Sequence, residues 1–143
     1  FKIHDQIIDS LKMCLSHYNV ENDIANLDYI ECINIVKYGK GNYFKLHTDD
    51  GQPYRCVVSA VGYPNDDYLG GEITFPKFNI NYKPQAEEFL IFPSSYIYIH
   101  SSEPVLDDRV KYSFVIMTDF NEFAHRNDSP VYHSKEYRQP YGL

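Results

Sequence analysis

Short stretches rich in β-branched and aromatic residues follow one another through most of this chain, separated by Gly, Pro, Asn and Asp. Residues of these kinds pack well on the pleated surface of a sheet. We predict strands at residues 29–38, 44–48, 54–62, 72–76, 88–92, 96–101 and 110–118, with a tight turn at Gly70 and Gly71. Strands this short and this closely spaced indicate an antiparallel sandwich or barrel.

The first 18 residues follow a different period. Apolar residues recur at spacings of three and four, for example at Ile7, Leu11 and Leu15. This spacing predicts an amphipathic helix over residues 1–18 that packs on the sheet, and the few cations on its polar face disfavour a membrane-surface role. A chain of 143 residues with 43% hydrophobic content suits one core. We therefore expect one domain over 1–143, with its core at about 29–120 and an irregular C-terminal tail at 121–143.

Three side chains form a candidate metal site. His47 and Asp49 are two residues apart at the end of a predicted strand, and alternate residues of a strand point to the same face. With His100 they make the two-histidine, one-carboxylate set of non-heme Fe(II) oxygenases, although catalytic zinc accepts the same ligands. Two alternatives remain open. His47 fits a half-buried strand histidine bonded to a backbone carbonyl, and Asp49 fits an Asx turn before Gly51.

Charge and cysteine content narrow the function classes. The net charge of −7 and the scattered 13 Lys and Arg residues argue against a nucleic-acid partner. No apolar run reaches 18 residues, so no membrane span is expected. Cys14, Cys32 and Cys56 are odd in number and widely spaced, which predicts reduced thiols and a cytoplasmic location. The chain begins at Phe1 and not at Met, which leaves targeting by an upstream segment open.

Four segments carry a family resemblance: YGKGNYFKLHTDDG, YPNDDYLGGEITFP, EEFLIFPSSYIYIH and HSSEPVLDDRVKYSFVIM. Through them, the chain from about residue 29 to about residue 120 resembles the Fe(II)- and 2-oxoglutarate-dependent dioxygenases of the prolyl 4-hydroxylase type. The resemblance implies a mainly β fold with a packing helix, the double-stranded β-helix or jelly roll. It also implies that His47, Asp49 and His100 are the iron ligands. In such a fold we expect His100 and Lys111 on neighbouring strands of the inner face.

The same resemblance implies residues for the cosubstrate. Lys111 would hold the distal carboxylate of 2-oxoglutarate, and Tyr38 and Tyr63 would line the cosubstrate pocket. Many relatives place the cation nine or ten residues after the distal histidine, whereas Lys111 comes eleven after it, so Arg109 is a competitor. We favour Lys111 because it directly precedes an aromatic residue, as the family's cation does. It also shares strand parity with residues 113, 115 and 117.

The implied reaction is hydroxylation of a C–H bond, most often in a prolyl residue of a peptide or protein, with succinate and CO2 as coproducts. Fe(II), 2-oxoglutarate and O2 would take part, with ascorbate as an optional addition. Two alternatives remain: hydroxylation of a free amino acid or small metabolite, and a non-catalytic metal-binding jelly-roll module.

Overall fold

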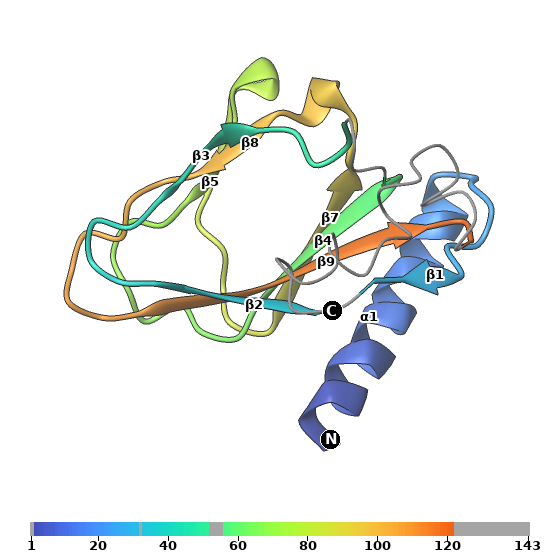
Figure 1. Ribbon diagram of the computed structural model, residues 1–143, viewed down its shortest axis with the longest axis horizontal. Helices are drawn as coiled ribbons and strands as arrows, with labels where there is room; N and C mark the ends of the chain where they lie inside the picture. Colours follow the sequence, from blue (N-terminus) through green and yellow to red (C-terminus); the bar gives the residue numbers. More distant parts are fainter. Residues whose placement is uncertain (1, 32, 52–55, 122–143) are drawn as a thin grey trace, which may run out of the picture.

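The computed structural model describes residues 2–31, 33–51 and 56–121 (Figure 1). The helix α1 spans Lys2–Glu21. The strands are β1 Tyr29–Ile30, β2 Asn34–Tyr38, β3 Phe44–His47, β4 Val58–Tyr63, β5 Ile73–Phe75, β6 Ile80–Tyr82, β7 Glu88–Pro93, β8 His100–Ser102 and β9 Lys111–Asp119. Two short 3-10 helices, η1 Pro76–Phe78 and η2 Tyr96–Tyr98, follow β5 and β7.

Two antiparallel sheets face each other (Figure 1). The larger sheet has the order β1-β9-β4-β7, and β2 also pairs with β9. The smaller sheet has the order β3-β8-β5-β6. Most neighbours within a sheet are distant in sequence, so the chain repeatedly crosses from one sheet to the other. This is the predicted jelly roll, and it leaves space between the two inner faces.

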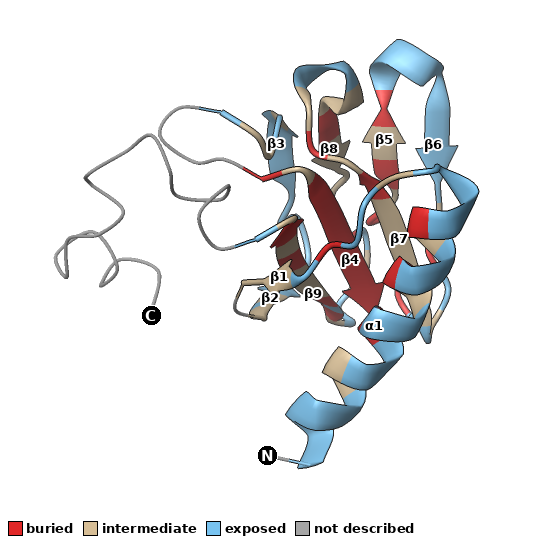
Figure 2. Ribbon diagram, turned by 90° about the vertical axis from the view of Figure 1, so that its right-hand side faces the viewer, coloured by how far each residue is buried: buried red, intermediate tan, exposed pale blue. Residues whose placement is uncertain are grey.

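The helix α1 covers the outer face of the larger sheet, where its buried side turns toward β4 and β7 (Figure 2). Leu11 and Leu15 are almost completely buried there in one cluster with Ala60 of β4 and Ile116 of β9. Burial of each leucine contributes about 1.5–3 kcal/mol to stability. The helix ends three residues later than the spacing predicted, at Glu21.

Alternation along the two central strands separates this helix-facing core from the inner face. On β4, Ala60 packs in the helix-facing cluster, whereas the neighbouring Val61 and Tyr63 line the space between the sheets. On β9, every second residue from Lys111 to Met117 lines the same space. The predicted shared face of Lys111 with residues 113, 115 and 117 is therefore present.

Several element boundaries differ from the predicted ones. The strand predicted at 96–101 begins only at His100, because η2 turns the chain between β7 in one sheet and β8 in the other. The strand predicted at 29–38 is interrupted between β1 and β2, although both segments pair with β9. The short strand β6 was not predicted, and its three residues are all exposed. Cys32 and the start of the strand predicted at 54–62 lie outside the described residues.

Within the described residues, no helix combines the length and apolar character needed to cross a bilayer. Cys14 and Cys56 are free thiols. The predicted tail lies outside the described residues from position 122 onward.

Candidate active site

A cavity of about 520 Å³ lies between the inner faces of the two sheets. All three candidate metal ligands line it, and so do Lys111 and Ser102. Much of the remaining wall is apolar and comes from both sheets, with Val36, Phe44, Val61, Ile73, Val115 and Met117. The candidate metal ligands and the Lys111 ammonium therefore lie in one cavity whose remaining surface is largely apolar.

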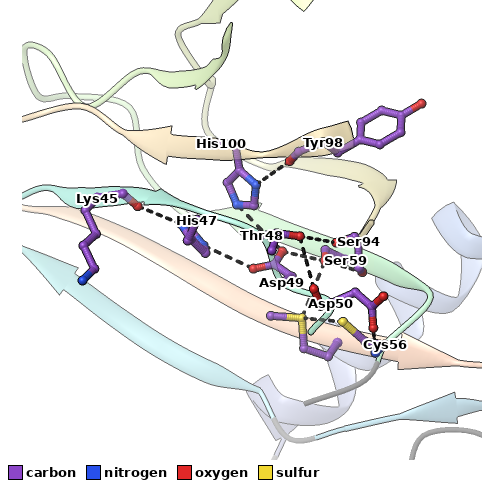
Figure 3. A network of polar contacts seen from close by, with 11 residues as sticks. Lys45, His47, Thr48, Asp49, Asp50, Cys56, Ser59, Ser94, Tyr98 and His100 are labelled. Carbon is purple, nitrogen blue, oxygen red and sulfur yellow. Dashed lines mark hydrogen bonds and ion pairs between the residues drawn. The ribbon is translucent and has the colours of Figure 1, made fainter. Parts of the chain in front are cut away.

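The three candidate ligands converge at one point (Figure 3). One donor atom from each of His47, Asp49 and His100 can be chosen so that all lie within 4.8 Å of one another. The Nε2 atom of His47 is 3.2 Å from Oδ1 of Asp49, and Nε2 of His100 is 3.8 Å from Oδ2. A metal ion needs its ligand atoms about 2.0–2.2 Å from its centre, which this spacing permits after small side-chain adjustments.

Strand pairing brings the two histidines together. His47 of β3 is the direct partner of His100 in β8, and their ring centroids are 4.3 Å apart. The register shifts between the pair Phe44–Ser102 and the pair His47–His100, so β3 has one extra residue there. This β-bulge lets Phe44 and His47, which are three residues apart, both face the cavity. Without the bulge, alternation would place them on opposite faces.

Both histidines are oriented in the same way. Nδ1 of His47 donates to the carbonyl oxygen of Lys45 at 2.8 Å, and Nδ1 of His100 donates to that of Tyr98 at 2.9 Å. A carbonyl oxygen only accepts, so the proton of each neutral ring is on Nδ1 and the lone pair is on Nε2. Metal-binding histidines are commonly fixed by such a bond from the other ring nitrogen. In each ring, Nε2 is therefore the nitrogen left to bind a metal beside the Asp49 carboxylate.

The alternative interpretation of His47 is thus also correct in its geometry, because the ring does bond to a backbone carbonyl. The two interpretations are compatible, since that bond leaves Nε2 for a metal. The Asx-turn alternative for Asp49 is not what the structure shows. Its carboxylate contacts both histidines and accepts a hydrogen bond from Ser59 Oγ at 2.6 Å.

The site's electrostatics suit a cation. Burial raises the pKa of Asp49, but the hydrogen bonds with His47 and Ser59 and the charges of the two histidines together outweigh it, so this pKa lies below its usual value. Burial holds the pKa of His100 below its usual value. Burial also lowers the pKa of His47, but the hydrogen bond of its protonated ring with Asp49, the backbone hydrogen bonds and the charge of Asp49 together hold this pKa above its usual value. An ionised carboxylate and a neutral imidazole are the forms that bind metals.

Lys111 lies at the start of β9 and is 1% exposed. Its Nζ donates to the carbonyl oxygen of Gly71 at 2.8 Å and to Ser102 Oγ at 2.7 Å. An ammonium group has three donors, so one is left for a ligand. The rings of Tyr38 and Tyr63 lie 5.0 and 5.6 Å from the same Nζ. The two tyrosines predicted to line the cosubstrate pocket therefore lie beside the predicted cation.

Arg109 is elsewhere. It lies on the turn before β9, with its side chain about half exposed and paired with Asp107. It does not line the cavity. The expectation that His100 and Lys111 occupy neighbouring strands was wrong, because β8 and β9 belong to opposite sheets. The turn between them carries the chain from one sheet to the other, and the Lys111 side chain reaches back from β9 to Ser102 of β8.

Ser59, Ser102 and Phe44 were not singled out from the sequence. Ser59 holds the Asp49 carboxylate and contacts Ser94 Oγ at 2.7 Å, and Ser102 holds Lys111. Serines carry no sequence signal for such roles. The parity of residue 102 with His100 on β8 was a usable signal, whereas Phe44 reaches the cavity only through the bulge.

Comparison with known protein families identifies one match. A family model described as the 2OG-Fe(II) oxygenase superfamily matches residues 33–118, which include all three candidate ligands and Lys111. No curated protein sequence matches the chain significantly.

Solved structures share the fold. A viral collagen prolyl hydroxylase from Paramecium Bursaria Chlorella virus-1, in complex with 2OG, has a TM-score of 0.67 and 19% identity, with 85% of this chain and 75% of that chain covered. A prolyl-4-hydroxylase from Pseudomonas putida has a TM-score of 0.66 and 22% identity, covering 82% and 65%. A prolyl hydroxylase from Trichoplax adhaerens, in complex with a hypoxia inducible factor peptide fragment, has a TM-score of 0.62 and 19% identity, covering 85% and 60%.

Proposed function

The chain belongs to the 2OG-Fe(II) oxygenase superfamily and is a 2-oxoglutarate-dependent dioxygenase, and on that premise we propose that it hydroxylates a prolyl residue of a peptide or protein. The observation that carries the proposal is the cavity itself, where a ligand triad and a buried cation share apolar walls. Two relatives in fold are named as prolyl-4-hydroxylase or collagen prolyl hydroxylase, and a third was solved with a peptide fragment.

We assign His47, Asp49 and His100 as the iron ligands. They fit Fe(II), because two imidazoles and one carboxylate leave open positions for small ligands. Bound Fe(II) with 2-oxoglutarate and O2 supplies the oxidising power to place a hydroxyl on a C–H bond, with succinate and CO2 as coproducts. The protein's own task is to orient the partners. Ser59 fixes the carboxylate and two backbone carbonyls fix the imidazoles.

Lys111 is assigned to the distal carboxylate of 2-oxoglutarate. Its remaining donor and its place on the wall of the cavity that the triad also lines suit a dicarboxylate whose other end lies at the metal. Tyr38 and Tyr63 flank the ammonium. Burial raises the pKa of Tyr38 above its usual value. Hydrogen bonds with Ser113 and Ser102 lower it, but by less. The tyrosine therefore stays protonated and can donate to an anion.

A peptide suits this cavity better than a free amino acid. A free amino acid carries an ammonium and a carboxylate, which need charged or polar partners when buried. Among the described residues that line the cavity, the ionisable groups other than tyrosines are the triad and Lys111. These are already assigned to the metal and to 2-oxoglutarate. Phe44 is 46% exposed at this wall and packs edge-on against His47, with 4.5 Å between ring centroids. It offers an apolar contact to a pyrrolidine ring.

The substrate class can be tested with a panel of proline-containing peptides, matched peptides with Ala in place of Pro, and free proline. Incubation with Fe(II) and 2-oxoglutarate in air is expected to form succinate in step with a gain of one oxygen on the Pro peptides alone. Mass spectrometry of the peptides and a succinate assay measure both. Oxygen gain on free proline or another small metabolite, with none on any peptide, would overturn the prolyl peptide proposal.

Affinity for 2-oxoglutarate is expected to fall in alkaline solution. Burial, and then the charge of Lys83, lower the pKa of Lys111 to about 8. Below that pH the ammonium is charged and binds the carboxylate, and above it the group is neutral. The association constant should therefore drop by about tenfold per pH unit above the pKa of the free protein. Anaerobic titration of the Fe(II) protein at several pH values measures it.

Lys111→Arg is the matched control, because a guanidinium stays charged throughout this range. Its affinity should be independent of pH over the same interval. An identical pH dependence in both proteins would assign the effect to another group.

A further inference from the structure

Two lysines donate hydrogen bonds to the carbonyl groups of one turn. The turn runs through Tyr68, Gly70 and Gly71, just before β5. Lys83, the residue after β6, donates from Nζ to the carbonyl oxygen of Tyr68 at 2.8 Å and to that of Gly70 at 2.7 Å. Lys111 donates to the carbonyl oxygen of the very next residue, Gly71, at 2.8 Å. Successive carbonyls of one turn are thus bound by two different ammonium groups.

The turn is packed too closely to shift without consequence. Gly71 has φ of +67°, which favours glycine, and a Cβ there would lie 2.9 Å from the Tyr68 ring and 3.1 Å from Cδ of Lys111. The Tyr68 ring is 2% exposed and lies beneath Lys83, with Nζ 3.5 Å from its centroid. Lys83, the ring, the turn and the stem of Lys111 therefore form one stack.

Lys83 itself is outside the cavity lining. It nevertheless fixes the peptide unit between Gly70 and Gly71, because Nζ binds the Gly70 carbonyl of that unit while its Gly71 N–H donates to the carbonyl oxygen of Pro104 at 3.0 Å. The Gly71 carbonyl begins the next peptide unit, so its direction is set relative to this fixed one. That carbonyl and Ser102 are the two groups that hold the Lys111 ammonium. The direction of the remaining Lys111 donor thus depends on the turn.

We propose that Lys83 is a positioning residue for the 2-oxoglutarate site, acting through the Tyr68–Gly71 turn to aim the Lys111 ammonium at the distal carboxylate. This inference depends on the proposed role of Lys111. Lys83 touches neither metal ligands nor cosubstrate in this assignment. Its effect is on affinity for one end of the cosubstrate and not on the oxidation step.

Lys83→Met removes the ammonium group and with it the hydrogen bonds to Tyr68 and Gly70, while it keeps an unbranched side chain of similar length. Anaerobic titration of the Fe(II) protein with 2-oxoglutarate, followed through the visible charge-transfer band of the chelated keto acid, is expected to show about tenfold weaker binding. At saturating 2-oxoglutarate, kcat should equal that of the unaltered protein, so the loss appears in KM. Lys83→Arg, which keeps cationic donors, should recover most of the affinity.

A second keto acid separates positioning from general structural damage. 2-Oxopentanoate has the same carbon chain as 2-oxoglutarate but a methyl group in place of the distal carboxylate. Its binding should be the same in Lys83→Met as in the unaltered protein, because it makes no ion pair with Lys111. Lys77→Met is the matched control for loss of a lysine, since Lys77 of η1 also lies over a tyrosine ring, that of Tyr96 in η2. It should leave both affinities unchanged.

Equal weakening for both keto acids would show that Lys83 only stabilises the fold and would overturn the inference, as would no weakening for either. If Lys83→Met does not fold, Lys83→Gln replaces it. Its side chain is one bond shorter and carries no charge, so it should give the same selective loss. Absence of the charge-transfer band in the unaltered protein would instead contradict the proposed function. The two failures are therefore distinguishable.

Discussion

Asp49→Ala is expected to abolish iron binding and all succinate formation. Asp49 is the one carboxylate in the triad, and both histidines are close to it. Loss of an outer partner of a metal ligand already costs about 10–100-fold in affinity, so removal of the ligand itself should cost at least about 100-fold. Equilibrium dialysis against Fe(II) without oxygen, with metal analysis, measures this directly.

Asp108→Ala is the control for this experiment. Its carboxylate is exposed and pairs with Lys40 at 3.1 Å, away from the cavity. It should bind one Fe(II) as tightly as the unaltered chain. Ser59→Ala should lie between the two, because it removes only the hydrogen bond that orients the carboxylate. Full iron binding by Asp49→Ala would mean that the triad is not the metal site.

Lys111→Met should lose 2-oxoglutarate affinity by a factor of hundreds to thousands while keeping Fe(II). Loss of one partner of a buried ion pair costs about 3–5 kcal/mol, which corresponds to that factor. Folding should survive, because burial disfavours the charged lysine and replacing a buried charge with an apolar side chain is often neutral. Anaerobic titration with 2-oxoglutarate and a thermal unfolding midpoint separate the two effects.

Arg109→Met is the informative comparison, since Arg109 is the other cation near the distal histidine in sequence. Its side chain pairs with Asp107 at the surface, so its removal should leave the affinity for 2-oxoglutarate unchanged. If Arg109→Met lost the affinity and Lys111→Met retained it, the assignment of the cation would be reversed.

The periodic spacing of residues along the chain gave the most accurate predictions. The period of two placed Lys111 on the same face as Met117, and the period near 3.6 placed Leu11 and Leu15 on the buried face of the helix. Such patterns arise from one element at a time, so a single sequence is enough to find them. The family resemblance then supplied the grouping of the triad with Lys111.

Features that depend on two elements could not be predicted in this way. Which strand pairs with which decides that His47 faces His100 in one sheet while Lys111 comes from the other. The hydrogen bond from Ser59 to Asp49 links two positions ten residues apart in sequence, one on β4 and one just after β3. The short strand β6 is defined by its pairing with β5. Its three residues are all exposed, so they show no alternation from which a strand could be predicted.

The extra residue in β3 makes the cavity wall depend on strand pairing as well as on residue type. If β3 kept its length but paired regularly with β8, Phe44 and His47 would be three positions apart on an alternating strand, and one of them would turn out of the cavity. Lys45 and Leu46 are both exposed, so the bulge is compatible with many side chains at these two positions. Any transplant of this site into another sandwich must therefore copy the bulge and not only the His-x-Asp motif.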